Sequence, residues 1–220
     1  MKNNDLKTLL LPGEGAELAR RVRSELRSKH GCHTILLYGS YARGDFTPES
    51  DIDILCVTEG GESSSDSRLW QGKYLDAWIY PQDQCVPTDF LHLNDAHILL
   101  DENSWGSEFL VQVKEAFAKG PEPLPEAERQ TRLVWFEKML DRIARDDLEA
   151  RYRKHWLLVD LLRNYFELRT LWYMGPKRSF QWLKEHDPEI YEAFQNLYSP
   201  DCSLEAIKEL TPKILVRSHS

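Results

Sequence analysis

The stretch from Leu36 to Val57, LLYGSYARGDFTPESDIDILCV, constrains the fold most, because it joins two apolar runs through a polar turn. Thr34–Tyr38 is predicted to be a short strand that ends at Gly39, and Asp51–Val57 is predicted to be a second strand. Gly39 lets the backbone turn sharply after the first strand. The segment therefore predicts a strand, a turn that leads into a short helix, and a second strand.

The second strand begins with two carboxylates, Asp51 and Asp53. Side chains alternate along a strand, so both aspartates point to one side while Ile52 points to the other. Two carboxylates this close repel each other unless a cation lies between them. Hard divalent cations such as Mg²⁺ prefer oxygen ligands. The pair is therefore a candidate metal site, and a solvated strand end is the alternative.

The turn after the first strand has the residues of an anion site. Gly39 allows close backbone approach, and the Ser40 hydroxyl joins the backbone N–H groups at a helix start. Arg43 follows, and it can contact a substrate phosphate or form a surface ion pair with Asp45. A phosphate cradle and a carboxylate pair this close in sequence could together hold a metal–nucleoside triphosphate.

A third carboxylate lies on a third predicted strand, Lys73–Tyr80, which carries Asp76. If this strand neighbours the second, Asp76 comes beside Asp51 and Asp53. Three carboxylates can hold two metal ions about 3.5–4 Å apart for in-line phosphoryl displacement.

The rest of the chain divides at a proline-rich segment, residues 120–125. Before it we expect helices over residues 15–30 and 105–119, a loop over 59–68, and a strand over 97–100. After it the strand signals vanish, and helices are expected around 133–143 and over 151–174, 177–186 and 188–197. Gly175-Pro176 is expected to end the second of these. The predicted class is α+β, with a first domain over 1–120 and an all-α domain over 121–220.

The composition of the chain limits the classes of partner and the location that we expect for it. The formal net charge of −8 makes general binding to nucleic acid unlikely, since that needs a clustered basic surface. The four cysteines form no C-x-x-C pair, which is typical of reduced thiols in a cytoplasmic protein. The leucine run before Pro12 is short for a signal peptide, and no apolar run reaches the length of a membrane span.

The combination of Gly39-Ser40, Ser50-Asp51-Ile52-Asp53 and a downstream strand aspartate resembles the nucleotidyltransferases of the DNA polymerase β superfamily. It is most similar to the minimal and the aminoglycoside nucleotidyltransferases. The resemblance implies a small mixed sheet with flanking helices, followed by a helical bundle. It implies that Asp51, Asp53 and Asp76 are catalytic and bind two Mg²⁺ ions.

The resemblance also implies the reaction. A nucleoside monophosphate, expected to be AMP from ATP, would pass to an acceptor hydroxyl with release of pyrophosphate. Gly39, Ser40, Arg43 and Ser50 are the expected nucleotide contacts. Lys177, in a Pro-Lys stretch that resembles one in aminoglycoside adenylyltransferases, is expected to reach the triphosphate.

The helical half offers one polar stripe, formed by Arg153, Asp160, Asn164 and Glu167 on the predicted long helix. It is either a solvated face or the lining of a cleft. In the second case Asp160 or Glu167 could bind a cationic acceptor or act as general base.

Several questions stay open at the level of sequence. The acceptor can be a small molecule, such as an aminoglycoside-like antibiotic, or a protein. A non-catalytic or antitoxin-type nucleotide-binding module is the alternative to an enzyme. A template-directed polymerase is disfavoured by the net charge of −8. The oligomeric state is not predicted.

Overall fold

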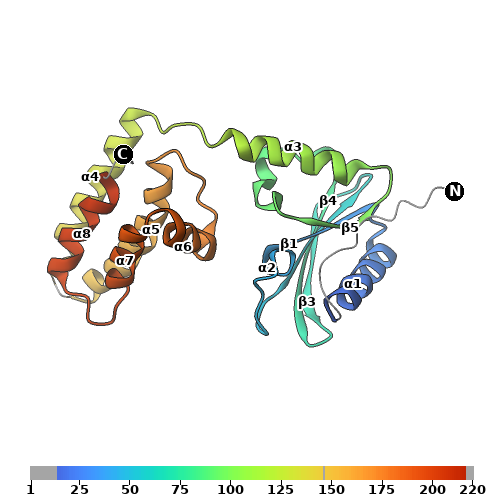
Figure 1. The fold of residues 1–220 in the computed structure, drawn as a ribbon, viewed down its shortest axis with the longest axis horizontal. Helices are drawn as coiled ribbons and strands as arrows, with labels where there is room; N and C mark the ends of the chain where they lie inside the picture. The colour runs from blue at the N-terminus through green and yellow to red at the C-terminus, as the bar shows by residue number, and fades with distance from the viewer. Residues whose placement is uncertain (1–13, 146, 217–220) are drawn as a thin grey trace. The chain divides into compact units, whose positions relative to one another are not determined.

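The computed structural model describes residues 14–145 and 147–216. These residues form two compact units that divide between Lys119 and Gly120 (Figure 1). The first unit contains a sheet with helices, and the second contains helices. The assignment of separate functions to the two halves stays a prediction.

The first unit follows the order predicted around the polar turn. Its helices are α1 (Glu14–His30), α2 (Gly39–Arg43) and α3 (Trp105–Lys119), with two 3₁₀ segments, η1 (Gln82–Gln84) and η2 (Pro87–Leu93). Its strands are β1 (Thr34–Tyr38), β2 (Ile52–Thr58), β3 (Ser64–Trp70), β4 (Lys73–Pro81) and β5 (His97–Asp101).

The five strands form one mixed sheet in the order β3-β4-β2-β1-β5. β2 and β4 run parallel, and the other neighbouring pairs are antiparallel. Asp53 of β2 faces Asp76 of β4 in the register, and Tyr38 of β1 faces Asp53 from the other side. The prediction that the strand of Asp76 neighbours that of Asp53 is confirmed.

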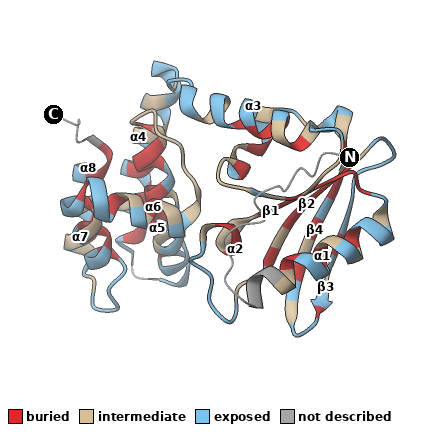
Figure 2. Cartoon of the chain, turned by 45° about the vertical axis from the view of Figure 1, so that its right-hand side comes forward, coloured by how far each residue is buried: buried red, intermediate tan, exposed pale blue. Residues whose placement is uncertain are grey.

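Each face of the sheet has its own core (Figure 2). Ile52, Ile54 and Cys56 pack with α1, whereas Leu55 and Val57 pack with η2 and α3. Because side chains alternate along β2, Asp53 lies on the same face as Leu55. The carboxylates therefore lie on the η2–α3 face of the sheet.

The prediction of a loop over residues 59–68 is wrong from Ser64 onward, because this segment forms most of β3. Trp70 and Lys73 pair across a two-residue turn in which Gln71 and Gly72 have φ of 50° and 80°. Such a turn matches the twist of the strands it joins. The serine-rich composition gave no strand signal, because only one face of β3 is buried. The buried residues on that face are Asp66 and Trp70.

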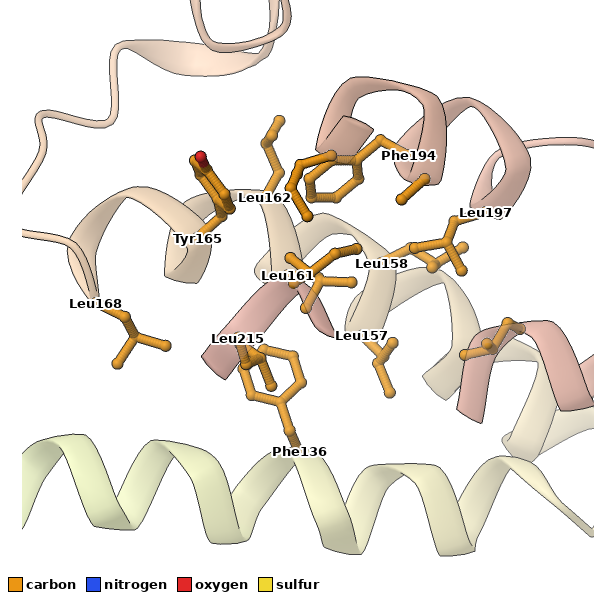
Figure 3. Close-up of a cluster of buried hydrophobic side chains, with 14 of the residues drawn as sticks. Phe136, Leu157, Leu158, Leu161, Leu162, Tyr165, Leu168, Phe194, Leu197 and Leu215 are labelled. Carbon is orange, nitrogen blue, oxygen red and sulfur yellow. The ribbon is translucent and has the colours of Figure 1, made fainter. Parts of the chain in front are cut away.

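The second unit contains α4 (Glu126–Ile143), α5 (Leu148–Glu167), α6 (Gly175–His186), α7 (Pro188–Leu197) and α8 (Leu204–Val216). Their apolar faces enclose a core centred on α5 (Figure 3). It includes Phe136 from α4, Leu161 and Tyr165 from α5, and Phe194 from α7.

Several helix limits in this unit differ from prediction, since α4 begins at Glu126 rather than near residue 133 and α5 at Leu148 rather than at residue 151. α5 ends at Glu167 rather than at residue 174, since Thr170 has a left-handed φ of 57° and Leu171 N–H donates to the carbonyl of Phe166. Gly175 then begins α6 instead of ending a helix. α8 was not predicted. Across the described ranges, no helix is both long and apolar enough to cross a membrane.

Candidate active site

The centre of the candidate site is the pair Asp53 and Asp76. The two residues are register partners on parallel neighbouring strands, and their side chains lie on the same face. Neighbouring strands lie about 4.8 Å apart, so the carboxylates are held side by side by backbone pairing.

The electrostatics of Asp53 reflect this placement. Burial, together with the negative charges of Asp76 and Asp51, raises the pKa of Asp53 to about 6, and the charge of Arg43 opposes the shift. The ionised form of Asp53 is therefore less favoured in the protein alone than in a free aspartate. A cation between the carboxylates would remove this repulsion.

Asp76 is held by two donors on the same face. Ser67 Oγ donates to Asp76 Oδ1 at 2.6 Å, and Trp78 Nε1 donates to Asp76 Oδ2 at 3.4 Å. Ser67 is the register partner of Asp76 on β3. The sequence reasoning missed Ser67 because its segment was predicted to be a loop; the two-residue turn ending at Gly72 is the signal that could have revealed the strand.

Gly39 is the point of closest approach between the turn and the carboxylates. Its φ is +69°, and a Cβ placed on it would lie 1.9 Å from Asp53 Oδ2. Only glycine avoids both the backbone strain and this collision. α2 begins at Gly39, so half-buried Ser40 also lies at the start of this helix, next to the pair.

The other residues predicted for this site occupy its margin. Asp51 is exposed and lies immediately before β2. Arg43 forms an ion pair with Asp45 at 3.3 Å, and its charge also acts on Asp53. Ser50 Oγ accepts a hydrogen bond from the Thr47 backbone N–H at 2.8 Å, so it closes the turn before β2. Their contacts with nucleotide stay predictions.

The carboxylate pair has the donor chemistry that Mg²⁺ requires. Asp53 and Asp76 supply the hard oxygen ligands that this ion prefers, and they already repel each other. Among the described residues, no three His, Cys, Asp or Glu side chains converge into a ready cation site. Two converging carboxylates fit the ion, with Asp51 as the neighbour that would complete the set.

A cavity of about 360 Å³ opens beside the pair on the same sheet face. It is lined by Tyr38, Leu55, Trp78, Tyr80, Gln84, Asp89, Phe90 and His92. Burial and the charges of Asp53 and Asp76 raise the pKa of Tyr38, which keeps its phenol protonated beside the carboxylates. The sequence predicted no site role for these lining residues; four of them lie in η1 and η2, which have no regular apolar period.

The residues predicted in the helical half lie in the second unit. Glu167 forms an ion pair with Arg132 of α4, and buried Asn164 accepts a hydrogen bond from the same guanidinium. Part of the polar stripe thus packs against α4.

Asp160 is half-buried. Its burial raises its pKa, and the positive charge of Arg163 opposes this shift. Lys177 is exposed in the first turn of α6. Their predicted roles stay predictions.

The mixed sheet and its carboxylate pair are features of a nucleotidyl-transferring enzyme. A family model described as "Nucleotidyltransferase domain" matches residues 19–185, more than half of the chain. The chain belongs to this nucleotidyltransferase family.

Individual relatives are similar over shorter stretches. Three proteins of Methanocaldococcus jannaschii, each named "Putative protein adenylyltransferase", match this chain. One is 51% identical over 41 residues, which cover 19% of this chain and 39% of the relative. Another is 46% identical over 50 residues, covering 23% and 47%. The match thus spans less than half of each relative.

A solved structure is also similar. It is a nucleotidyltransferase-like protein from Exiguobacterium sibiricum, with 16% identity and a TM-score of 0.44. The match covers 92% of this chain and 73% of that chain.

Proposed function

We propose that this enzyme transfers AMP from ATP to an acceptor hydroxyl and releases pyrophosphate. The observation that carries the proposal is the register pairing of Asp53 with Asp76, directly against Gly39 at the start of α2. The preference for ATP is supported by the names of the three adenylyltransferase relatives.

Mg²⁺ is the proposed metal, with two ions expected. Asp51, Asp53 and Asp76 would hold them. When bound, the metal lowers the charge repulsion at the α-phosphate and favours the ionised form of the attacking hydroxyl. Ser67 and Trp78 hold the Asp76 carboxylate in position through their hydrogen bonds.

The triphosphate is proposed to lie at the start of α2. Gly39 leaves room for close approach, and the Ser40 hydroxyl and nearby backbone N–H groups can donate to phosphate oxygens. Arg43 adds positive charge on the same side, and Ser50 fixes the turn that leads to Asp51. Lys177 is proposed as a further phosphate contact from the second unit.

The acceptor is proposed to be a hydroxyl of a protein or of a small molecule. The names of the relatives favour a protein. Asp160 and Glu167 remain candidates for contact with a cationic acceptor, although Glu167 would first have to leave Arg132. We also propose a cytoplasmic location, because the four scattered cysteines are free thiols.

The test is a nucleotide panel. The protein is incubated with Mg²⁺ and each α-labelled nucleoside triphosphate, alone and with a cell extract, and pyrophosphate and labelled products are measured. We expect label from ATP to enter an acceptor, and EDTA to abolish the transfer. Nucleotide binding without transfer to any acceptor would instead favour the non-catalytic module.

A further inference from the structure

We propose that the exposed face of α5 is an interface between two copies of this chain, which pair antiparallel about a two-fold axis beside Trp156. The face lies wholly on one helix of the second unit. The inference is independent of the proposed function, because it uses no residue of the candidate active site.

The exposed face of α5 is rich in large apolar side chains. Leu148 is 83% exposed, Tyr152 65%, Trp156 51% and Val159 60%. Steps of four, four and three residues keep the four side chains on one side of the helix, opposite the residues that form the core. No other helix or strand in the described ranges exposes as many large apolar side chains. Such a face marks a surface that binds a partner.

α5 holds this face on a rigid support. The Asp147 side chain accepts a hydrogen bond from the Ala150 N–H at 2.7 Å and caps the start of the helix. The opposite side of α5 is fully buried at the centre of the helical core (Figure 3). The Tyr152 and Trp156 rings also meet edge to face, with centroids 6.2 Å apart. Little conformational freedom is therefore lost when a partner covers the face.

The area of the face suits a dimer. With roughly 200 Å² for a whole aromatic side chain, the four exposed fractions leave on the order of 500 Å² of apolar surface on each copy. Two copies would bury on the order of 1,000 Å² from these side chains alone. The polar side chains that flank them would bring the total into the range of specific interfaces, which begins at about 1,200 Å².

The charges beside the apolar face identify a second copy as the partner. Glu149 and Arg163 are exposed and lie seven residues before and after Trp156, on the same side of the helix. An antiparallel two-fold pairing brings Glu149 of each copy opposite Arg163 of the other. Within one chain the two residues are about 21 Å apart along the helix, so they cannot pair with each other.

The same rotation pairs two further residues. Tyr152 and Asp160 lie four residues before and after Trp156, so each phenol would meet the other copy's carboxylate. The phenolic hydroxyl can donate a hydrogen bond to that carboxylate. Trp156 would meet its own counterpart at the axis, and a large aromatic side chain is typical of the centre of an interface.

A parallel pairing is excluded by the same charges. It would bring Glu149 beside Glu149 and Arg163 beside Arg163, and like charges repel. The contacts that these residues make in their own chain leave them accessible. Glu149 accepts a hydrogen bond from Arg153 at 2.8 Å, and Arg163 lies 5.4 Å from the centroid of the Tyr173 ring. Both side chains remain exposed beside these contacts.

The experiment measures the mass of the full chain in solution by sedimentation equilibrium and light scattering, without ATP. We expect a dimer. Val159→Asp places a charge in the middle of the apolar face and should raise the dimer Kd at least about a hundredfold. Val111→Asp makes the same change on α3, where the valine is 55% exposed, and should leave the Kd within about threefold. Circular dichroism checks that both variants fold.

Charge reversal tests the antiparallel pairing itself. Glu149→Arg and Arg163→Glu each place like charges opposite one another, so each alone should raise the dimer Kd at least about tenfold. The double variant exchanges the two charges and should return the Kd to within about threefold of the wild type. Because the two residues cannot pair within one chain, this rescue reports a contact between copies.

Three outcomes would overturn the proposal. One is a wild-type chain that stays monomeric at about 100 µM, because the α5 face would then be free or covered by the first unit or another protein. Another is a dimer that Val159→Asp leaves intact, because the interface would then lie elsewhere. The third is a double charge variant that dimerises no better than the single variants. None of these results depends on AMP transfer, so they leave the proposed function to its own test.

Discussion

At Gly39, both the backbone conformation and the position of the Asp53 carboxylate depend on the absence of a side chain. We predict that Gly39→Ala abolishes transfer, since its Cβ would displace the Asp53 carboxylate. Left-handed strain adds a loss of stability of about 1–3 kcal/mol. Steady-state kinetics and thermal unfolding measure both effects.

Gly44→Ala is the matched control for that substitution. Gly44 has a φ of +78°, but a Cβ on it would have no neighbour within 4 Å. It should therefore show similar strain and retain most activity. Equal loss of activity in both variants would contradict the role of the Gly39–Asp53 contact.

The raised pKa of Asp53 predicts a pH dependence in the metal-free protein. An acid whose pKa rises on folding contributes stability that is present below its unfolded pKa of about 3.9 and is lost as pH rises through its folded pKa. That folded pKa is about 6. At pH 7, Asp53→Asn should therefore be at least as stable as the wild type, with the difference shrinking toward pH 4. Thermal unfolding with EDTA tests this, and a less stable Asn variant at pH 7 would contradict it.

For single residues, the spacing in the sequence was enough to predict where the carboxylates and Gly39 lie in the strands and the turn. Asp51, Asp53, Asp76, Gly39 and Ser40 belong to short local patterns whose geometry follows from strand alternation and turn chemistry. Tyr38, Ser67 and Trp78 could not be found in this way. Their roles depend on register across three strand pairs, which no local pattern specifies.

At the scale of elements, β3 links the site to the outer helix. On the face away from Ser67, buried Asp66 accepts hydrogen bonds from Lys29 and His30 of α1, each at 2.9 Å, and from Arg68 at 2.8 Å. Burial alone would raise the pKa of Asp66, but these bonds outweigh it and hold the pKa well below its usual range.

We predict that Asp66→Asn destabilises the first unit by about 1–3 kcal/mol, because it weakens the bonds to three basic side chains. The contribution of Asp66 is fully present above its unfolded pKa of about 3.9 and is lost progressively as pH falls from that value through its lowered folded pKa, so it is reduced at pH 3. Urea unfolding at pH 7 and pH 3 measures it. Glu62→Gln, on an exposed residue just before β3, is the control and should be nearly neutral.

The other face of β3 gives a functional prediction. Ser67→Ala removes the 2.6 Å hydrogen bond to Asp76, and kcat/KM should fall by about tenfold or more with little change in unfolding temperature. Ser65→Ala, on an exposed residue of the same strand face, should leave both unchanged. Equal kcat/KM values in the two variants would contradict a role for Ser67 in positioning Asp76.

Helices and strands were predictable from the sequence where a buried face gave a regular spacing of apolar residues. β1, β2, β4 and α3 carry buried faces and were expected at nearly their observed limits. β3 is an edge strand with one buried face, so its serines resembled a loop. α5 was extended too far because the apolar residues after Glu167 continue its pattern through a turn that packs on the same core.

At the scale of the whole molecule, three separate cores support two compact units, two in the first unit and one in the second. A ligand that binds only the native first unit stabilises that unit by mass action. We predict that ATP with Mg²⁺ slows hydrogen exchange first in α2, β2 and β4. Protection that appears in α6 as well would support the proposed reach of Lys177 to the triphosphate. Protection confined to the second unit would contradict the placement of the nucleotide.

The role of the carboxylate pair is tested most directly by the rate of AMP transfer from ATP in Asp53→Asn and Asp76→Asn, measured beside Asp141→Asn on the exposed surface of α4. All three substitutions remove one carboxylate charge and keep nearly the same shape. We predict that the first two variants lose transfer by at least about a thousandfold while folding normally. Asp141→Asn should match the wild type. Wild-type transfer rates in Asp53→Asn or Asp76→Asn would show that this carboxylate pair is not the site of nucleotidyl transfer.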